Sequence, residues 1–203
     1  MNKNRKPSSL FSLFLTVLLV SIMVLSVLFS RDRNKINDAY TDIMQIDLIS
    51  SYTQRLISLA VNKEHTNSDV LVVNDLTENA LSVQGAEVLS SKENPSVTLR
   101  ADEVLQNWYL IQEILLHSED LSQGEGEIDL VSLKLARDAH FTSMRELSVE
   151  IGLYTQELKQ HISFYQLLIT VFTCLITLMV FTKELQIKFA KERLTRKKEL
   201  TNE

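Results

Sequence analysis

Two uncharged apolar runs constrain this chain more than any other feature of its sequence. Residues 10–30 read LFSLFLTVLLVSIMVLSVLFS, and residues 164–181 read FYQLLITVFTCLITLMVF. At about 1.5 Å per residue, a helix over the first run is about 30 Å long, which is the thickness of a bilayer's hydrocarbon core. Neither run has the polar face of an amphipathic helix. The sequence therefore predicts two transmembrane helices.

The main alternative for the first run is a cleaved signal peptide. Such peptides have an apolar region of about 7–15 residues that ends in a small-x-small cleavage site. Here the run is longer, and it ends at the bulky Leu28 and Phe29 just before Arg31. This pattern favours a membrane anchor.

Basic residues collect at the two ends of the chain. Residues 1–9 carry three Lys/Arg and no acid, and residues 182–203 carry seven Lys/Arg against four Glu. Because Lys and Arg near a span stay on the cytoplasmic side, both termini are predicted to be cytoplasmic. Arg31, Arg33 and Lys35 are the charges that oppose this orientation. We expect a multi-pass protein of the inner (cytoplasmic) membrane, surrounded there by membrane lipid.

The segment between the spans is strongly acidic. Residues 31–163 hold 11 Lys/Arg and 22 Asp/Glu, a balance that argues against nucleic acid as a partner. The one cysteine, Cys174, lies in the second apolar run, so no disulfide is expected between the spans. Turn-like stretches at 62–69, 90–96 and 118–127 divide the segment into four pieces with helical periodicity.

Apolar residues recur at three- and four-residue steps in each piece. The first seam is Ile36, Ala39, Ile43, Ile46, Ser50, Thr53, Ile57 and Ala60. The last is Leu133, Arg137, His140, Met144, Leu147, Ile151, Tyr154, Leu158, His161 and Tyr165. The inner seams are shorter: Val70, Val73, Leu76, Ala80 and Val83, then Val104, Leu105, Trp108, Ile111 and Leu115. A long outer pair with a shorter inner pair predicts an antiparallel four-helix bundle.

The expected fold class is all-α, with two transmembrane helices that flank an extracytoplasmic antiparallel four-helix bundle. The predicted segments are a cytoplasmic N-terminal tail (1–9), a first transmembrane helix (10–30), the extracytoplasmic bundle (31–163), a second transmembrane helix (164–181) and a basic cytoplasmic helical tail (182–203).

Part of the first outer helix resembles a known class of membrane sensors. The run Thr53-Gln54-Arg55-Leu56 is similar to the second half of a signature carried by the nitrate/nitrite sensor kinases and the type IV pilus chemotaxis transducers. The tryptophan of the third helix and the passage of the fourth helix into a span are also similar. The resemblance implies a periplasmic four-helix-bundle sensor domain. Ser50 stands where those families carry a first arginine, so ligand contact is implied only for Arg55, with Gln54 as its companion.

Six polar residues are the candidate ligand-binding residues. They are Ser50, Thr53, Gln54, Arg55, Arg137 and His140. A guanidinium fork suits a small anionic ligand, and polar groups on a helix seam have to be paired or hydrated. Two alternatives stay open. Arg55 pairs with an acid of a neighbouring helix, or a slightly different register turns Arg137 and His140 outward.

Chemistry beyond binding has no support in the sequence. The four histidines, at positions 65, 117, 140 and 161, do not form the i, i+4 pair of a helical metal site. The sequence has no Gly-x-Ser-x-Gly elbow and no Gly-rich phosphate loop. We therefore expect no metal, no cofactor and no enzymatic activity. Trp108 is in phase with Leu105 and Ile111, which favours a core position.

The segment after the second span has a helical composition without Gly or Pro. It is similar to the helix that links sensor spans to an output domain, and about 22 residues are too few to form such a domain. The expected function is a sensor-only transmembrane receptor. We expect a homodimer that binds a small ligand or a partner outside and relays helix displacement to a cytoplasmic kinase, cyclase or chemotaxis-type partner in trans. The alternative is a non-signalling membrane scaffold or accessory subunit of an envelope complex, with a basic tail that rests on anionic lipid.

Overall fold

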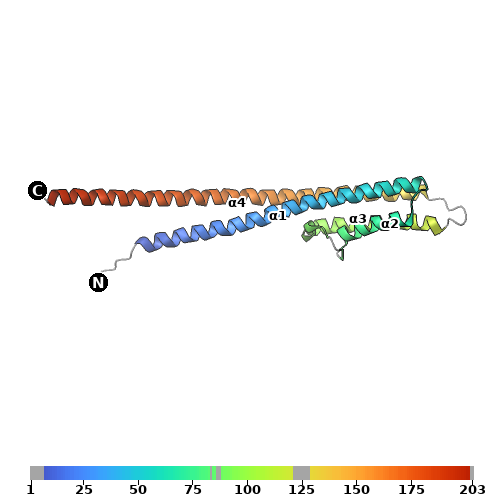
Figure 1. The fold of residues 1–203 in the computed structure, drawn as a ribbon, viewed down its shortest axis with the longest axis horizontal. Coiled ribbons are helices and arrows are strands. Elements are labelled where there is room, and N and C mark those ends of the chain that lie inside the picture. The colour runs from blue at the N-terminus through green and yellow to red at the C-terminus, as the bar shows by residue number, and fades with distance from the viewer. Residues whose placement is uncertain (1–6, 83, 86–87, 121–128, 202–203) are drawn as a thin grey trace. The chain divides into compact units, whose positions relative to one another are not determined.

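The computed structural model describes residues 7–82, 84–85, 88–120 and 129–201. Its elements in chain order are α1 (Pro7–Val61), α2 (Asn67–Leu81), the short 3-10 helix η1 (Ser90–Glu93), α3 (Pro95–Asp120) and α4 (Leu130–Thr201) (Figure 1). No strand occurs in these ranges. The predicted all-helical class is confirmed, and the two longest helices are those that contain the apolar runs.

Local side chains set where three of the helices begin. Thr66 and Asp69 form a capping box, in which the Asp69 carboxylate accepts the Thr66 N–H at 2.9 Å and the Thr66 hydroxyl accepts the Asp69 N–H at 3.3 Å. Asp129 accepts the N–H of Val131 at 3.0 Å, before the first turn of α4. Pro95 opens α3 at a position where a backbone N–H has no partner within the helix.

The second helix ends earlier than its periodicity predicts. The expected break was 90–96, whereas α2 ends at Leu81 and an irregular connection with η1 follows. Ser82 has extended dihedral angles, φ −71° and ψ 145°, and these stop the helix. The Leu89 N–H then donates to the Ala80 carbonyl at 3.1 Å, which brings the connection back against the end of α2. Val83, expected on this helix, lies outside the described residues.

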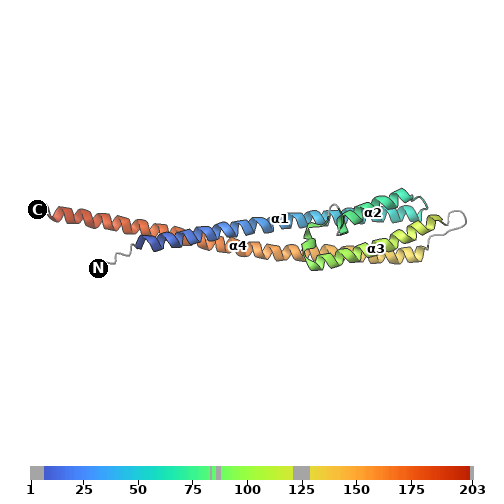
Figure 2. The ribbon, with the colours of Figure 1, turned by 90° about the horizontal axis from the view of Figure 1, so that it is seen from below.

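The chain divides into two compact units. We call residues 33–159 the core unit, and residues 1–32 together with 160–203 the span unit. α2 and α3 belong wholly to the core unit, whereas α1 and α4 each contribute residues to both units. Figure 2 shows α2 and α3 alongside the parts of α1 and α4 that belong to the core unit.

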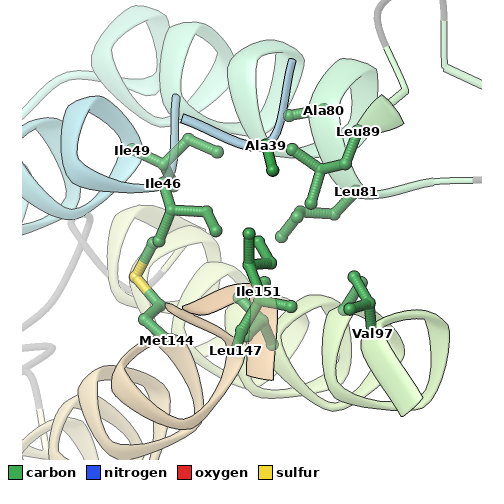
Figure 3. Packing of buried hydrophobic residues seen from close by; sticks show 12 residues of the cluster. Ala39, Ile46, Ile49, Ala80, Leu81, Leu89, Val97, Met144, Leu147 and Ile151 are labelled. Carbon is green, nitrogen blue, oxygen red and sulfur yellow. The ribbon is translucent and has the colours of Figure 1, made fainter. Parts of the chain in front are cut away.

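Two apolar clusters fill the core unit, and each draws side chains from all four helices. The first cluster includes Ile46, Leu81, Val97 and Leu147, and Figure 3 shows its side chains turned toward a common centre. The second includes Leu56, Val73, Ile111 and Leu133. Because every helix contributes to both clusters, the four helices share one core rather than packing as separate pairs.

The buried seams of α1 and α4 differ from the predicted ones at several positions. Asp42, Ile49, Ala136 and Thr155 are buried in place of their neighbours, the predicted Ile43, Ser50, Arg137 and Tyr154. The predicted His161 is not on the buried seam, because its side chain is 52% exposed. At each of these four positions the structure takes the same three- and four-residue steps in the opposite order, as in 46–49–53 in place of 46–50–53, so the seam stays on one face of the helix. Ile49 and Ala136 are apolar where Ser50 and Arg137 are polar, and the buried Asp42 and Thr155 have hydrogen-bond partners. The predicted His140 keeps its inward position and is fully buried.

The span unit contains both apolar runs, each within an uninterrupted helix. Both helices are long and apolar enough to cross a membrane, and only 6% and 0% of their most apolar stretches are buried. Hydroxyl groups in the runs donate to backbone carbonyls one turn earlier, as Thr173 does to Ile169 at 2.7 Å. Such bonds satisfy polar groups without water. Soluble proteins rarely expose so much apolar surface on one helix, and this exposure is consistent with association with a membrane.

Candidate functional site

A groove between α1 and α4 brings together three of the six candidate residues. Its volume is about 620 Å³. On the α1 side its lining residues are Ser50, Gln54, Ile57, Ser58, Val61 and Asn62. On the α4 side they are Arg137, Asp138 and Phe141. The groove lies within the core unit, and it contains the candidates Ser50, Gln54 and Arg137.

One ion pair supplies the charge in this groove. The Arg137 guanidinium donates from Nε and Nη2 to the same oxygen, Oδ1 of Asp138, at 2.9 and 2.7 Å. The side chains of Arg137 and Asp138 are 39% and 56% exposed. An ion pair so open to water contributes little to stability, because solvent screens it and two mobile side chains have to be held. The side chains of Arg137 and Asp138 can therefore also interact with charged groups of a bound molecule.

Arg55 lies apart from the groove, in a smaller hollow. That hollow has a volume of about 160 Å³, and Tyr52 and Asp69 also line it. The pKa of the Asp69 carboxyl is lowered, mainly by its hydrogen bonds with Thr66 and further by the positive charge of Arg55. Among the described residues no carboxylate forms a direct ion pair with Arg55. The structure thus places Arg55 near an acid of α2, on the outer face of α1.

The other two candidates, Thr53 and His140, lie in the core. Both are fully buried, and neither the Thr53 hydroxyl nor either ring nitrogen of His140 has a hydrogen-bond partner among the described residues. The His140 ring lies between aromatic neighbours, with centroids 6.2 Å from Trp108 and 5.8 Å from Phe141. Burial lowers the pKa of His140 to about 4, although the nearby Val104 backbone works in the opposite direction. His140 is therefore neutral at pH 7.

Polar side chains separate the two apolar clusters. Thr53 on α1 lies in sequence between Ile49 of the first cluster and Leu56 of the second, and His140 lies between Ala136 and Met144 in the same way. Buried polar groups within an apolar core cost stability, and they also define which positions of neighbouring helices face each other. We call Thr53, Thr77 and His140 the polar layer.

Hydrogen bonds between helices surround the polar layer. The Trp108 indole donates from Nε1 to Oδ1 of Asn74 at 3.0 Å and so joins α3 to α2. The Asn107 amide donates to the Ser143 hydroxyl at 3.1 Å and joins α3 to α4. Trp108 is fully buried, as the sequence predicted. These bonds fix the relative register of three helices close to His140.

Sequence reasoning missed several residues of these sites. They are Ser58, Val61, Asn62, Asp138 and Phe141 in the groove, Thr77 in the polar layer and Asn74 beside Trp108. Asp138 and Phe141 follow Arg137 and His140 directly in the sequence. A helical wheel that gave both flanks of the seam equal weight would have included them. Asn74 gave no such signal, because its role depends on which residue of α3 faces it.

The groove offers hydrogen bonds, one exposed ion pair and an apolar wall, which together suit reversible binding of a small molecule. Among the described residues no group of three or more His, Cys, Asp or Glu side chains is arranged to hold a metal ion.

No family model, curated protein or solved structure matches this chain. The resemblance of residues 53–56 to the nitrate/nitrite sensor kinases and the type IV pilus chemotaxis transducers therefore stays a prediction.

Proposed function

We propose that this chain is a transmembrane receptor. Residues 10–30 and 164–181 cross the inner membrane, residues 31–163 form an extracytoplasmic four-helix bundle, and both termini are cytoplasmic. The bundle binds a small ligand or a partner protein, and the two spans transmit a displacement to a cytoplasmic kinase, cyclase or chemotaxis-type protein.

The continuity of α1 and α4 carries this proposal. Each is a single helix that includes an apolar run and a stretch of the four-helix core, from Pro7 to Val61 and from Leu130 to Thr201. A helix without a break transmits a shift of about 1–2 Å along its axis, which is the size of known switching movements. Binding that alters the packing of α1 against α4 is thereby coupled to the spans.

A homodimer is part of the proposal, and the outer face of α1 supports it. Met44 and Leu48 are 72% and 48% exposed, and Arg55 follows on the same face at helical spacing. Large apolar side chains on an exposed helix face are typical of surfaces that pack against another protein. In such a dimer two Arg55 side chains approach each other, and a small anionic ligand would neutralise them.

The orientation is tested by cysteine labelling in intact cells. Cys174 is first replaced by Ser, and single cysteines are then placed at the exposed positions Gln106 and Lys188. A membrane-impermeant maleimide should reach Gln106→Cys from outside the inner membrane and should label Lys188→Cys only after the membrane is opened. The reverse pattern would contradict the proposal.

The relay is tested on the full chain in lipid nanodiscs. Disulfide cross-linking between two copies through Lys188→Cys is followed while nitrate, phosphate or L-leucine is added in turn. A ligand that raises the thermal midpoint of the core unit should also change the cross-linking rate. If the ligand is an anion at Arg55, the variant Arg55→Ala should lose both responses, and an unchanged response would remove Arg55 from the site.

A membrane scaffold is the second candidate function. Leu99 and Leu110 on α3 are 61% and 50% exposed, and they offer an apolar surface. A scaffold should co-purify with another envelope protein through this surface and show no thermal shift with small molecules. Substituting both leucines by Ser should then release the partner.

A further inference from the structure

The groove between α1 and α4 has the size of a small-ligand site. Its volume of about 620 Å³ falls within the range of about 300–1,000 Å³ that holds small molecules and cofactors. Residues from two helices line it, so a bound molecule would touch both α1 and α4. These are the two helices whose movement the proposed receptor function requires.

The charges of the groove favour a zwitterion over a simple anion. Among its lining residues Arg137 is the only cation and Asp138 the only anion, so the formal charges cancel. A lone anion would gain Arg137 but would meet Asp138 beside it, because like charges repel. A molecule with both a carboxylate and an ammonium group satisfies both side chains.

The geometry of the ion pair leaves atoms free on both partners. Both hydrogen bonds from Arg137 end on Oδ1 of Asp138, and neither Oδ2 of Asp138 nor Nη1 of Arg137 is bonded to another described residue. The Oδ2 atom can accept from an ammonium group. The guanidinium can turn its remaining N–H groups to a carboxylate, and a planar fork binds that group through two parallel bonds.

The rest of the groove is suited to an apolar side chain. Ile57, Val61 and Phe141 supply hydrocarbon surface, and Gln54 and Asn62 supply neutral hydrogen-bonding groups. We propose that the groove binds a free amino acid with an apolar side chain. Its carboxylate lies on Arg137, its ammonium group on Asp138 and its side chain against Phe141.

This site is also connected to the polar layer. Phe141 packs edge-on against the buried His140 ring at 5.8 Å, and Ile57 belongs to the second apolar cluster. A ligand that moves Phe141 therefore changes the packing around the His140 imidazole, whose ring nitrogens have no hydrogen-bond partner among the described residues. This coupling to the packing around His140 rests on the proposed receptor function. The binding of an amino acid in the groove does not depend on that function.

Calorimetric titration of the full chain in nanodiscs tests the ligand class. The probes are L-leucine and three molecules that each lack one of its features: 4-methylpentanoate without the ammonium group, 3-methylbutylamine without the carboxylate, and glycine without the side chain. Leucine should bind, and each of the three should bind at least about tenfold more weakly. Equal binding of leucine and 4-methylpentanoate would overturn the proposal. So would dissociation constants above about 1 mM for valine, leucine, isoleucine, methionine and phenylalanine alike.

Four variants locate the site. Arg137→Gln and Asp138→Asn should each weaken leucine binding at least about tenfold, because each leaves one charge of the ligand unpaired. Arg145→Gln and Glu157→Gln are the matched controls, since both positions are exposed on α4 and neither lines the groove. Unchanged thermal midpoints verify that all four variants fold. Leucine binding that survives Arg137→Gln and Asp138→Asn would overturn the inference.

The same samples separate this inference from the receptor function. Leucine that binds through Arg137 and Asp138 but leaves cross-linking at Lys188→Cys unchanged supports the ligand class and contradicts the relay. A relay that responds to nitrate alone and is lost in Arg55→Ala supports the receptor and contradicts the amino-acid site.

Discussion

The carboxylate of Asp42 accepts a hydrogen bond of 2.7 Å from the backbone N–H of Ser91, a residue 49 positions further along the chain. A second bond of 3.1 Å comes from the N–H of Ser90. Asp42 is 3% exposed, so its charge is held almost entirely by these donors and the Ser90 hydroxyl. The connection between α2 and α3 is thereby fixed to α1.

Replacing Asp42 by Ala should destabilise the core unit by about 3 kcal/mol. The substitution leaves the buried N–H of Ser91 and the part-buried N–H of Ser90 without their acceptor, and hydrogen bonds to a charged group are the stronger kind. Asp42→Asn keeps one oxygen as acceptor and should cost about 1 kcal/mol. The measurement is urea-induced unfolding in detergent, followed by the fluorescence of the only tryptophan, Trp108.

Asp47 provides the matched control, because it is an exposed acid on the same helix. Asp47→Ala should change the free energy of unfolding by less than about 0.5 kcal/mol. If Asp42→Ala and Asp47→Ala behaved alike, the connection would not depend on Asp42.

His140 should make stability depend on pH in one direction. Its pKa in the folded protein is about 4, below the ordinary value of 6.5, so the unfolded chain binds more protons between those values. Stability should therefore be complete above about pH 6.5 and decrease as the pH falls toward 4. At pH 5 the loss due to this group should be about 2 kcal/mol relative to pH 7.

The variant His140→Leu tests whether His140 causes this pH dependence of stability. It removes two buried nitrogens that have no partner among the described residues and puts an apolar side chain in the core. The difference in stability between pH 7 and pH 5 should therefore shrink by about 2 kcal/mol. Thr53→Val is the control, because it removes another buried polar atom of the polar layer, one that has no partner among the described residues and does not titrate, and this variant should keep the full difference. A His140→Leu protein with an unchanged pH profile would contradict the assignment.

Lys63 occupies the left-handed region of backbone space, with φ 58°, two residues after the end of α1. Its N–H donates to the Ala60 carbonyl at 3.0 Å, and the next N–H donates to Leu59, so the last turn of the helix depends on this conformation. Glycine adopts it without the steric cost that a Cβ brings. Lys63→Gly should therefore stabilise the core unit by about 1 kcal/mol, whereas Lys134→Gly within α4 should destabilise it by about 1 kcal/mol.

The helices themselves could be predicted because their signals are local. The chain has four Gly and two Pro, and the apolar residues of the third helix keep one phase from Val104 to Leu115. Those residues are fully buried as the spacing predicted, apart from the half-buried Leu105. In α1 and α4 two neighbouring residues lie close enough to the core face at some steps, and the structure buries the apolar Ile49 rather than Ser50 and the apolar Ala136 rather than Arg137.

The candidate site could be predicted only in part, because it depends on pairs of helices. Ser50 and Gln54 belong to the predicted seam of α1 and its edge, and Arg137 to the predicted seam of α4. Their presence in one groove requires that α1 lies beside α4. The buried carboxylate of Asp42 gave no signal, because a polar residue on a helix is normally exposed. Its burial is possible only where the connection 82–94 supplies donors, and no local pattern encodes that contact.

Cys174 gives a direct test of the membrane assignment for α4. It is the only cysteine, it lies near the middle of the second apolar run, and its side chain is exposed in the folded chain. In water an exposed thiol reacts readily, whereas in the hydrocarbon core a charged maleimide cannot reach it, because transfer of an ion into that medium is strongly unfavourable. A charged maleimide should therefore leave Cys174 unlabelled in both intact and lysed membranes, and labelling should begin only after denaturation in sodium dodecyl sulfate.

The control is the variant Cys174→Ser with Ser96→Cys. It should label without denaturation once the outer face is accessible, since residue 96 is exposed at the start of α3. Rapid labelling of native Cys174 in intact membranes would mean that water reaches the middle of the run, and the run would then not lie in lipid.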